Sequence, residues 1–463
     1  MRRRDFLRTV GVGVASLMAS GPASGASSIR ASQSRPNFIV IVADDLGWND
    51  LGCYGHQAIR TPNIDRLATE GLRFTHAFLT CSSCSPTRCS IMTGRYPHST
   101  GAKELHQPLP ADQVVFGGLL KQGGYYTASA GKWHLGEAAK VNFDTVVAGG
   151  PSGCEKWVET LQNRPKDKPF FMWLAALDPH RGYQPNTIPE PHEPEDAMVP
   201  PFLPDVAETR EDLALYYDEV ARMDGYIGRV LDELERQRVA GNTFVLFLSD
   251  NGRPFPRCKT TLYDSGVKTP LVVRWPGKVR PGSVCDSLVS VIDIAPTIVE
   301  LAGLAPSPTF QGESFSSLLG RPEGSIREHV FAEHNWHDYQ AHERSVRSKR
   351  YLYICNAFPH LPCTPPADAV RSITFQAMRK RRDVDELSPE QLACFVSPRT
   401  EEELYDVQLD PYQLLNVAAD PKYAKVLAQM RAVHEQWSRT TRDGIAEKPT
   451  PDQFDRETGR RLK

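Results

Sequence analysis

One short segment of the chain places a thiol among residues that could support nucleophilic chemistry. It spans residues 84–95, reads CSPTRCSIMTGR, and carries Arg88 four positions after Cys84. On a helix that begins near the proline of this segment, that spacing would point the guanidinium back toward the thiol. The neighbours Cys81 and Cys89 leave a plainer interpretation open, in which the three thiols are buried, paired in a disulfide or half of a zinc site.

Two stretches of apolar, β-branched residues end in oxygen ligands. Residues 37–42 and 244–248 are predicted to be buried parallel strands, whose carboxyl ends share one edge of a sheet. The side chains that follow supply oxygen only, which favours calcium or magnesium over zinc. Any one of them could instead cap a helix, but four at two strand ends predict a metal site. They are Asp44, Asp45, Asp250 and Asn251.

These patterns resemble the type I sulfatases. The segment that starts at Cys84 matches the family's signature C-x-P-S/T-R-x-x-x-x-T-G. The resemblance implies that a formylglycine-generating maturation enzyme oxidises Cys84 to an aldehyde, and that the hydrate of this formylglycine attacks sulfur. It also implies a Ca²⁺ cofactor, with Mg²⁺ less favoured, bound by the oxygen of modified Cys84 and by the four oxygen ligands above.

The resemblance gives a role to five basic side chains. Arg88 would orient the aldehyde hydrate, Lys132 would hold the charge of the nucleophile and the sulfate, and His134 would act as the base. His180 would contact the bridging oxygen or nitrogen as a proton donor or hydrogen-bond partner. Lys259 would clamp the sulfate and help to neutralise the leaving group. Without the resemblance, a buried histidine or an exposed lysine would be the ordinary interpretation of each.

Two segments resemble one branch of the family, the N-sulfoglucosamine sulfohydrolases that act on heparan sulfate. They read DPHR at 178–181 and DNGRPFP at 250–256. The resemblance implies a sulfated saccharide as substrate, with N-sulfated glucosamine foremost. Lys259 departs from that branch, which carries arginine there. Lysine carries a compact charge and cannot form the two parallel hydrogen bonds that an arginine guanidinium makes, so this position does not support the preference for an N-sulfated sugar. An O-sulfated glycan therefore stays an alternative substrate.

Two other functions fit the same residues. Related enzymes with the same aldehyde and a similar metal site cleave phosphonates or phosphodiesters, so relative rates on sulfate and phosphodiester substrates separate the two activities. A chain whose Cys84 stayed unmodified would lack the nucleophile and would act as an exported glycan-binding protein. Mass spectrometry of the Cys84 peptide separates that function from an enzyme.

The order of strands and helices agrees with the α/β, alkaline-phosphatase-like fold that the resemblance implies. Apolar strands that alternate with amphipathic helices would form a large, mostly parallel sheet flanked by helices. We predict a catalytic domain at 35–327 and a smaller C-terminal α+β subdomain with a short antiparallel sheet at 328–440. Residues 441–463 contain few apolar side chains and are predicted to be a flexible tail.

Three local predictions concern the surroundings of the site. A helix at 211–235 is predicted to begin with a capping box made by Thr209 and Asp212. The proline-rich loop 184–204 is too long for a plain connector, so we expect it to wall the active site. In the segment 333–337, a tryptophan and two histidines would either stack on a sugar ring or form an ordinary surface loop.

The first 26 residues resemble a twin-arginine export signal, because Arg3 and Arg4 precede an apolar run and several small residues. The partner would be the twin-arginine export machinery, and the product would be periplasmic or secreted. The apolar run is too short to span a bilayer, so no stable membrane span is expected. Removing the segment, with its four arginines and one aspartate, changes the formal net charge from −2 to −5. We expect no nucleic-acid partner, and local lysines and arginines must hold a sulfated substrate.

An exported chain with ten cysteines invites disulfides. If Cys84 becomes an aldehyde, nine cysteines remain, so at least one stays unpaired. The preferred pair is Cys355 with Cys363, which lie on either side of a proline-containing loop.

Overall fold

An eight-stranded sheet forms the centre of the structure, a computed structural model that describes residues 35–463. The export signal expected at residues 1–26 lies outside the described residues. The strand order is β4-β3-β5-β1-β6-β7-β2-β8. The strands are β1 (Asn37–Ala43), β2 (Leu72–Phe78), β3 (Tyr126–Gly131), β4 (Thr145–Val147), β5 (Phe170–Ala175), β6 (Thr243–Ser249), β7 (Leu271–Arg274) and β8 (Ser283–Ser290).

The middle of this sheet is parallel. β1 pairs with β5 and β6 so that Val40 aligns with Trp173 on one side and with Leu246 on the other. β7 runs antiparallel to both of its neighbours, β6 and β2. The prediction of a large, mostly parallel sheet is confirmed. Because β1, β3, β5 and β6 point the same way, the residues that follow them meet at one edge.

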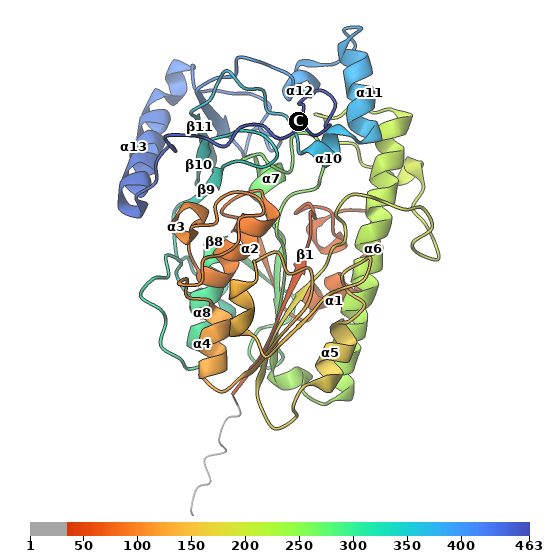
Figure 1. Cartoon of the computed structure of the whole chain (residues 1–463), viewed down its shortest axis with the longest axis vertical. Coiled ribbons are helices and arrows are strands. Elements are labelled where there is room, and N and C mark those ends of the chain that lie inside the picture. The colour runs from red at the N-terminus through yellow and green to blue at the C-terminus, as the bar shows by residue number, and fades with distance from the viewer. Residues whose placement is uncertain (1–34) are drawn as a thin grey trace, which may run out of the picture. The chain divides into compact units, whose positions relative to one another are not determined.

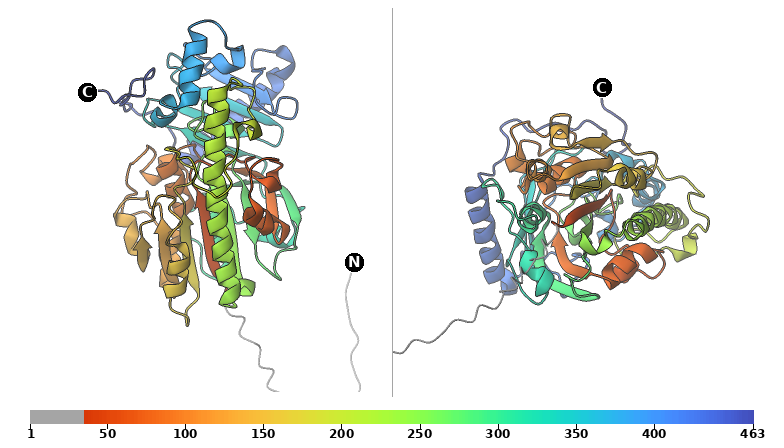
Figure 2. Two further views of the ribbon diagram at one scale, coloured as in Figure 1. Left: turned by 90° about the vertical axis from the view of Figure 1, so that its right-hand side faces the viewer. Right: turned by 90° about the horizontal axis from the view of Figure 1, so that it is seen from below.

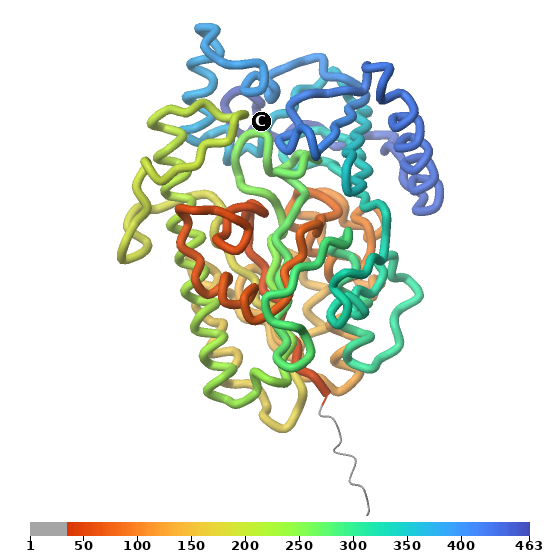
Figure 3. Tube along the Cα trace, turned by 180° about the vertical axis from the view of Figure 1, so that it is seen from behind, coloured from red at the N-terminus to blue at the C-terminus, as the bar shows by residue number. Residues whose placement is uncertain are grey.

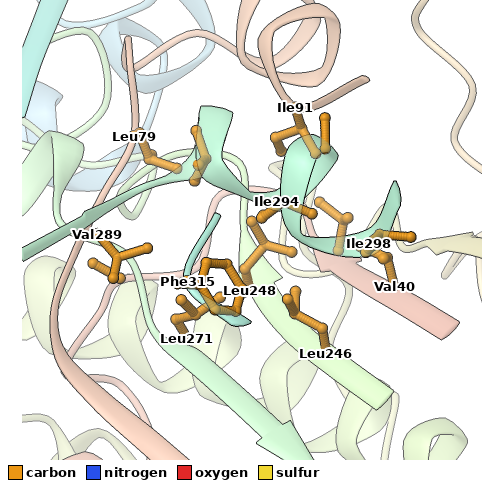
Figure 4. Packing of buried hydrophobic residues seen from close by; sticks show 14 of the residues in the cluster. Val40, Leu79, Ile91, Leu246, Leu248, Leu271, Val289, Ile294, Ile298 and Phe315 are labelled. Carbon is orange, nitrogen blue, oxygen red and sulfur yellow. The ribbon is translucent and has the colours of Figure 1, made fainter. Parts of the chain in front are cut away.

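Helices cover both faces of the sheet (Figures 1 and 2). Alternate residues of β1 enter two separate cores, with Ile39 on one face and Val40 on the other. Figure 4 shows the core that contains Val40, whose side chain lies near those of Ile294 and Ile298. Burial on both faces explains why β1 is apolar throughout. One face carries α1 (Pro62–Thr69), α5 (Trp157–Asn163) and α6 (Ala207–Arg236), and the other carries α2 (Cys84–Thr93), α4 (Phe116–Gln122) and α8 (Ile294–Leu301).

The long helix α6 begins earlier than the sequence predicts. Val206 occupies its N-cap position without a side-chain cap, so the predicted capping box of Thr209 and Asp212 is wrong. The carboxylate of Asp212 instead accepts two hydrogen bonds from Arg181, at 2.8 and 2.9 Å, and one from Thr374 at 2.6 Å. The side chain of Asp212, which the local pattern assigns to the helix cap, therefore forms an ion pair with Arg181 from another part of the chain.

A second, four-stranded antiparallel sheet lies at one end of the molecule (Figure 3), in the order β12-β11-β10-β9. One face packs on α13 through side chains such as Val346 and Leu427, while Ile354 and Tyr405 join the core that contains α8. Residues 35–463 form one compact unit. Its remaining elements are β9 (Val330–His334), β10 (Glu343–Arg347), β11 (Tyr351–Asn356), β12 (Glu402–Asp406), α3 (Pro97–Thr100), α7 (Asp264–Val267), α9 (Ser316–Gly320), α10 (Ala367–Val370), α11 (Ile373–Arg382), α12 (Pro389–Leu392) and α13 (Ala424–Thr441).

The last residues of the chain, for which the sequence predicts a flexible tail, make defined polar contacts. The indole of Trp336 donates to the carbonyl of Pro451 at 2.8 Å, and Asp452 accepts from the backbone N–H of Gln340 at 2.6 Å. Arg456 forms an ion pair with Asp452 at 2.6 Å. Hydrogen bonds and ion pairs, together with one aromatic side chain, Phe454, that packs against the core containing α6, hold this segment against the body of the protein.

All ten cysteines lie in the described part of the chain, and all are free. The predicted disulfide between Cys355 and Cys363 is therefore wrong. Cys355 packs toward α13, whereas Cys363 lines a small cavity together with Asn356. Because neighbouring residues of a strand point to opposite faces, the two thiols lie on different sides of the second sheet. Among residues 35–463, no helix combines the length and the apolar character needed to cross a membrane.

Candidate active site

The predicted site residues meet where four parallel strands end. Asp44 and Asp45 follow β1, Asp250 and Asn251 follow β6, and Lys132 follows β3. Polar residues collect at this edge because parallel strands all deliver their carboxyl ends to it. β5 contributes the turn that carries His180, and α2 begins with Cys84. His134 and Lys259 come from the loops that follow β3 and β6.

Three carboxylates form the deepest part of the site. Asp44, Asp45 and Asp250 are fully buried, and each offers an oxygen within 4.8 Å of the others. The amide of Asn251 donates to Asp45 at 2.8 Å and to Asp250 at 2.7 Å. Two buried oxygens, Oδ1 of Asp44 and Oδ1 of Asn251, have no hydrogen-bond partner among the described residues. Buried anions with spare oxygens could hold a hard divalent cation.

Each carboxylate is also paired with a cation. Arg88 Nε lies 2.7 Å from Asp250 Oδ2, and Lys259 Nζ lies 2.8 Å from Asp45 Oδ2. Lys132 forms an ion pair with Asp44. Arg88 also donates to the backbone carbonyl of Lys132 at 2.9 Å, which links α2 to the end of β3.

The carboxylates respond differently to burial. Burial raises the pKa of Asp44, but the nearby cations, led by Lys132, outweigh it and hold that pKa below its usual value. Burial raises the pKa of Asp250 to about 6, because Arg88 offsets the burial only in part and the neighbouring Asp44 adds to the rise. Asp44 is thus held ionised more firmly than Asp250, and a carboxylate must be ionised to bind a metal.

Cys84 lies on the floor of a pocket at the start of α2. Its side chain packs with Leu105 and Trp336, and only 3% of the residue is exposed. Burial raises the pKa of this thiol to about 11, although Lys132 and Lys259 oppose the rise. An unmodified Cys84 would therefore stay a neutral thiol, which is a weak nucleophile.

The two predicted histidines face different neighbours. Nε2 of His134 lies 2.8 Å from Nδ1 of His106, and Nδ1 of His134 has no partner among the described residues. Burial, together with the charges of Lys132 and Arg88, lowers the pKa of His134 to about 2, so this imidazole is neutral. Nδ1 of His180 donates to the backbone carbonyl of Arg181 at 2.7 Å.

Two ion pairs fix the turn that carries His180. Arg222 on α6 binds both carboxylate oxygens of Asp178, at 2.9 and 2.7 Å, and Arg181 is held by Asp212 of the same helix. The carbonyl of Asp178 accepts from the backbone N–H of Asp44 at 3.0 Å. The predicted metal ligand and the predicted proton donor are therefore positioned by one connected network.

A cavity of about 520 Å³ opens above this region. Five of the predicted residues line it, namely Cys84, Lys132, His134, His180 and Lys259. The loop 184–204 contributes none of the described lining residues, so its predicted place at the active site is wrong. That loop packs on α6 instead, where the backbone N–H of His192 donates a hydrogen bond to the carboxylate of Asp218 at 2.8 Å. Trp336 is buried beneath the pocket rather than free to stack on a sugar.

Several lining residues were not predicted from the sequence. They come mostly from the C-terminal part of the chain and are Leu105, His106, Asp338, Ala367, Asp368, Arg371 and Phe454. Each lies in a loop or short helix without a recognisable spacing, so no local signal could have identified it. Only the packing of the second sheet and the last segment against the first sheet brings them to the site. His337 also lines the cavity and belongs to the segment 333–337, for which the sequence predicts either sugar contact or a surface loop.

Comparison with known proteins agrees with this geometry. The family model of sulfatases matches residues 36–153 and 152–304, which is more than half of the chain. The protein belongs to the sulfatase family, whose members are sulfuric ester hydrolases. A model of the C-terminal part of N-sulphoglucosamine sulphohydrolase matches residues 257–358. Human N-sulphoglucosamine sulphohydrolase is 32% identical over 464 residues, which cover 89% of this chain and 91% of the human one.

Solved structures share the fold. One is a complex of a protein with its substrate D-glucosamine-2-N,6-O-disulfate, with a TM-score of 0.67, 21% identity, and coverage of 91% of this chain and 100% of the other. Another is the phosphonate monoester hydrolase of Agrobacterium radiobacter, with a TM-score of 0.67, 19% identity and coverage of 88% and 96%. These likenesses confirm the predicted α/β sulfatase fold.

Proposed function

We propose that this protein is an exported, calcium-dependent sulfatase that removes sulfate from saccharides, with N-sulfated glucosamine as its foremost substrate. One observation carries the proposal: Lys132, Lys259, His134 and His180 line the same cavity as Cys84. Positive charge around the candidate nucleophile suits a sulfate monoanion. The identity with the human N-sulphoglucosamine sulphohydrolase supports the N-sulfated substrate. The twin-arginine pattern of residues 1–26 supports export by that machinery to the periplasm or beyond.

The carboxylate cluster fits a resident divalent cation. Its ligands would be Asp44, Asp45, Asp250 and Asn251, and the spare oxygens of Asp44 and Asn251 are the observation that favours an ion over a closed ion-pair network. When bound, the cation supplies positive charge that polarises a sulfate oxygen. Oxygen ligands from protein alone favour Ca²⁺ over Mg²⁺, which keeps more of its water.

Cys84 fits conversion to formylglycine. Its side chain lines the cavity, and its thiol is too weakly acidic to serve as a thiolate at neutral pH. The hydrated aldehyde supplies an oxygen nucleophile where the thiol cannot. A formylglycine-generating maturation enzyme is therefore a required partner of this chain.

The chain's own residues bind the substrate and move protons. Burial opposes the charge of Lys132 and Lys259, but neighbouring carboxylates, Asp44 and Asp45 respectively, raise the pKa of each lysine, so both stay cationic and can hold sulfate oxygens. His134 is neutral, and Nδ1, which has no partner among residues 35–463, is the atom at which it would act as the base. His180 keeps Nε2 for the bridging atom because Nδ1 is engaged by a backbone carbonyl.

The test is sulfate release from N-sulfated glucosamine beside its 6-O- and 3-O-sulfated isomers, with protein produced alongside a maturation enzyme. Mass spectrometry of the Cys84 peptide from the same preparation establishes whether the aldehyde is present. Preferred release from the N-sulfated sugar supports the proposal. Release only from an O-sulfated isomer would replace the substrate and keep the chemistry, whereas no release by fully converted protein contradicts it.

A second candidate, hydrolysis of phosphonates or phosphodiesters, is favoured by one observation. The phosphonate monoester hydrolase from Agrobacterium radiobacter shares the fold over most of both chains. Relative rates on an aryl sulfate and on a phosphodiester separate this activity from sulfate release. A preparation that retains the thiol of Cys84 at full occupancy and still binds sulfated glycans would indicate the third possibility, a glycan-binding protein without catalysis.

A further inference from the structure

The cavity has two chemically different linings. Cations and histidines from the first part of the chain surround Cys84. The C-terminal part contributes His337 and Arg371 and, in addition, two carboxylates, Asp338 and Asp368, and one aromatic ring, Phe454. A sulfate group gains nothing from the two carboxylates and the ring, so this second lining calls for a different part of the ligand.

Asp338 presents one carboxylate oxygen that the protein does not use. Its Oδ2 accepts a hydrogen bond from the backbone N–H of Ala367 at 2.9 Å, which fixes the orientation of the side chain. Oδ1 forms no hydrogen bond within residues 35–463, and the residue lines the cavity. Burial raises the pKa of Asp338, and the hydrogen bond from Ala367 opposes that rise. A carboxyl group in either protonation state can form a hydrogen bond with a hydroxyl, so the free oxygen is available to the ligand.

Asp368 is arranged in the same way at the start of α10. Its Oδ1 accepts from the backbone N–H of Ala369 at 2.7 Å. Its Oδ2 lies 3.8 Å from Nε2 of His180, which is too long for a hydrogen bond. Burial raises the pKa of Asp368, but Lys259, His180 and Arg181 outweigh it and keep the pKa below its usual value, so this acceptor is charged.

Phe454 adds an apolar surface beside these acceptors. It belongs to the last segment of the chain, which is held by a bridge between Phe454 and Arg461 and by a 2.9 Å hydrogen bond from the N–H of Gln453 to the carbonyl of Asp338. The ring and the Asp338 carboxylate are thus fixed relative to one another. An aromatic face next to charged acceptors fits a molecule with C–H surface and hydroxyl donors.

We propose that Asp338, Asp368 and Phe454 form a subsite for the uncharged part of a sugar ring whose sulfate lies among the cations. Ring hydroxyls next to the sulfated position donate to the two carboxylates, and the ring packs against Phe454. A second sulfate at those hydroxyls would meet the negative charge of Asp368, so the subsite disfavours a ring that is sulfated there. This subsite rests on the proposed function of the same cavity.

The test measures binding rather than turnover, in the Cys84→Ala background, by calorimetry with N-sulfated glucosamine and with inorganic sulfate. Adding Asp338→Asn or Asp368→Asn should weaken binding of the sugar by about 10- to 100-fold, the range expected for a charge-assisted hydrogen bond. Binding of inorganic sulfate should change by less than about threefold, because the cations remain. Asp383→Asn, at an exposed position after α11, should alter neither.

Phe454→Ala is a second, independent variant, and thermal unfolding checks that each variant is folded. It should weaken sugar binding and leave sulfate binding unchanged, whereas Phe454→Leu should restore part of the loss. Equal affinities of the parent and all three variants for the sugar would overturn the subsite, as would a parallel loss for sugar and sulfate. If the wild type instead binds the sugar but releases no sulfate from it, the proposed activity fails while the binding data still decide the subsite.

Discussion

Each buried carboxylate of the site is matched by one buried cation, and the pairing explains how so much charge is kept inside the protein. Arg88 with Asp250 and Lys259 with Asp45 are each at most 2% exposed. Removing one member of such a pair leaves an uncompensated charge, which costs far more than the pair itself contributes. Substitutions in this cluster therefore change stability as well as activity, and the two effects must be measured separately.

Cys84→Ala should abolish sulfate release while leaving the fold intact. The side chain packs with Leu105 and Trp336 and loses only a sulfur atom in the change. We expect no detectable sulfate release and a free energy of unfolding within about 1 kcal/mol of the wild type. Sulfate release and thermal unfolding check this. Cys53→Ala, at a half-buried thiol outside the cavity, is the control and should keep full activity.

Arg88→Gln should lower the free energy of unfolding by about 3–5 kcal/mol, because Asp250 would stay buried without its partner. Chemical denaturation of metal-free protein measures this loss. The matched control is Arg431→Gln, since Arg431 pairs with Glu402 at the surface and is 46% exposed. That change should cost no more than about 1 kcal/mol. Similar losses in both variants would show that the burial of Asp250 does not matter.

At the scale of elements, β1 and β6 follow the predicted boundaries closely, because a strand that is apolar on both faces must be buried on both faces, as in the middle of a parallel sheet. The start of α6 was mispredicted, since Asp212 binds Arg181 across the structure instead of capping its own helix. Local spacing carries no information about such a partner. The antiparallel direction of β7 could not be predicted either, because the sequence of a four-residue strand does not indicate whether it pairs parallel or antiparallel.

Helix α6 also caps α1, and this contact should make stability depend on pH. Asp224 accepts hydrogen bonds from the N–H groups of Asn63 and Ile64, at 3.1 and 2.8 Å, and burial raises its pKa to about 6. A carboxyl whose pKa is higher in the folded state stabilises the fold at low pH and loses that contribution as pH rises. The free energy of unfolding of the wild type, relative to Asp224→Asn, should fall by about 3 kcal/mol between about pH 4 and pH 7.

Denaturant unfolding of both proteins across this pH range measures that difference. Asp232→Asn is the control, because Asp232 lies on the same helix and its side chain is 72% exposed. The difference between wild type and this control should not vary with pH. A gap between wild type and Asp224→Asn that is constant, or that grows with pH, would contradict the raised pKa.

For the whole molecule, the cations of the cavity and its C-terminal lining come from separate parts of the sequence. The motifs around Cys84 and Asp250 could be predicted, because in each motif the functional residues lie within a few positions of one another in the sequence. Asp338, Asp368 and Phe454 could not, because each acquires a role only when the second sheet and the last segment pack over the cavity. The class of chemistry is therefore encoded locally, whereas the shape of the ligand site is a property of the complete fold.

Calcium should stabilise the whole protein. An ion that binds only the folded state raises the free energy of unfolding by about 2.7 kcal/mol when its concentration is about 100 times the dissociation constant. Treatment with a chelator should thus lower the unfolding temperature and abolish sulfate release. Added Ca²⁺ should restore both, and Mg²⁺ should restore them less well. The unfolding temperature of the Asp44→Asn variant should not change when Ca²⁺ is added. If neither chelator nor Ca²⁺ changes the unfolding temperature of the wild type, the metal site is contradicted.

The burial of Cys84 imposes an order of events in time. The thiol is 3% exposed and packs against Trp336, a residue that the ribosome adds 252 positions later. No enzyme of ordinary size can reach a side chain so covered. Any enzymatic conversion of Cys84 must therefore be complete while the newly made chain is still open, before its last third has folded into place. If the protein folds before this step, Cys84 would stay an unmodified thiol, and adding more maturation enzyme after folding would not convert it.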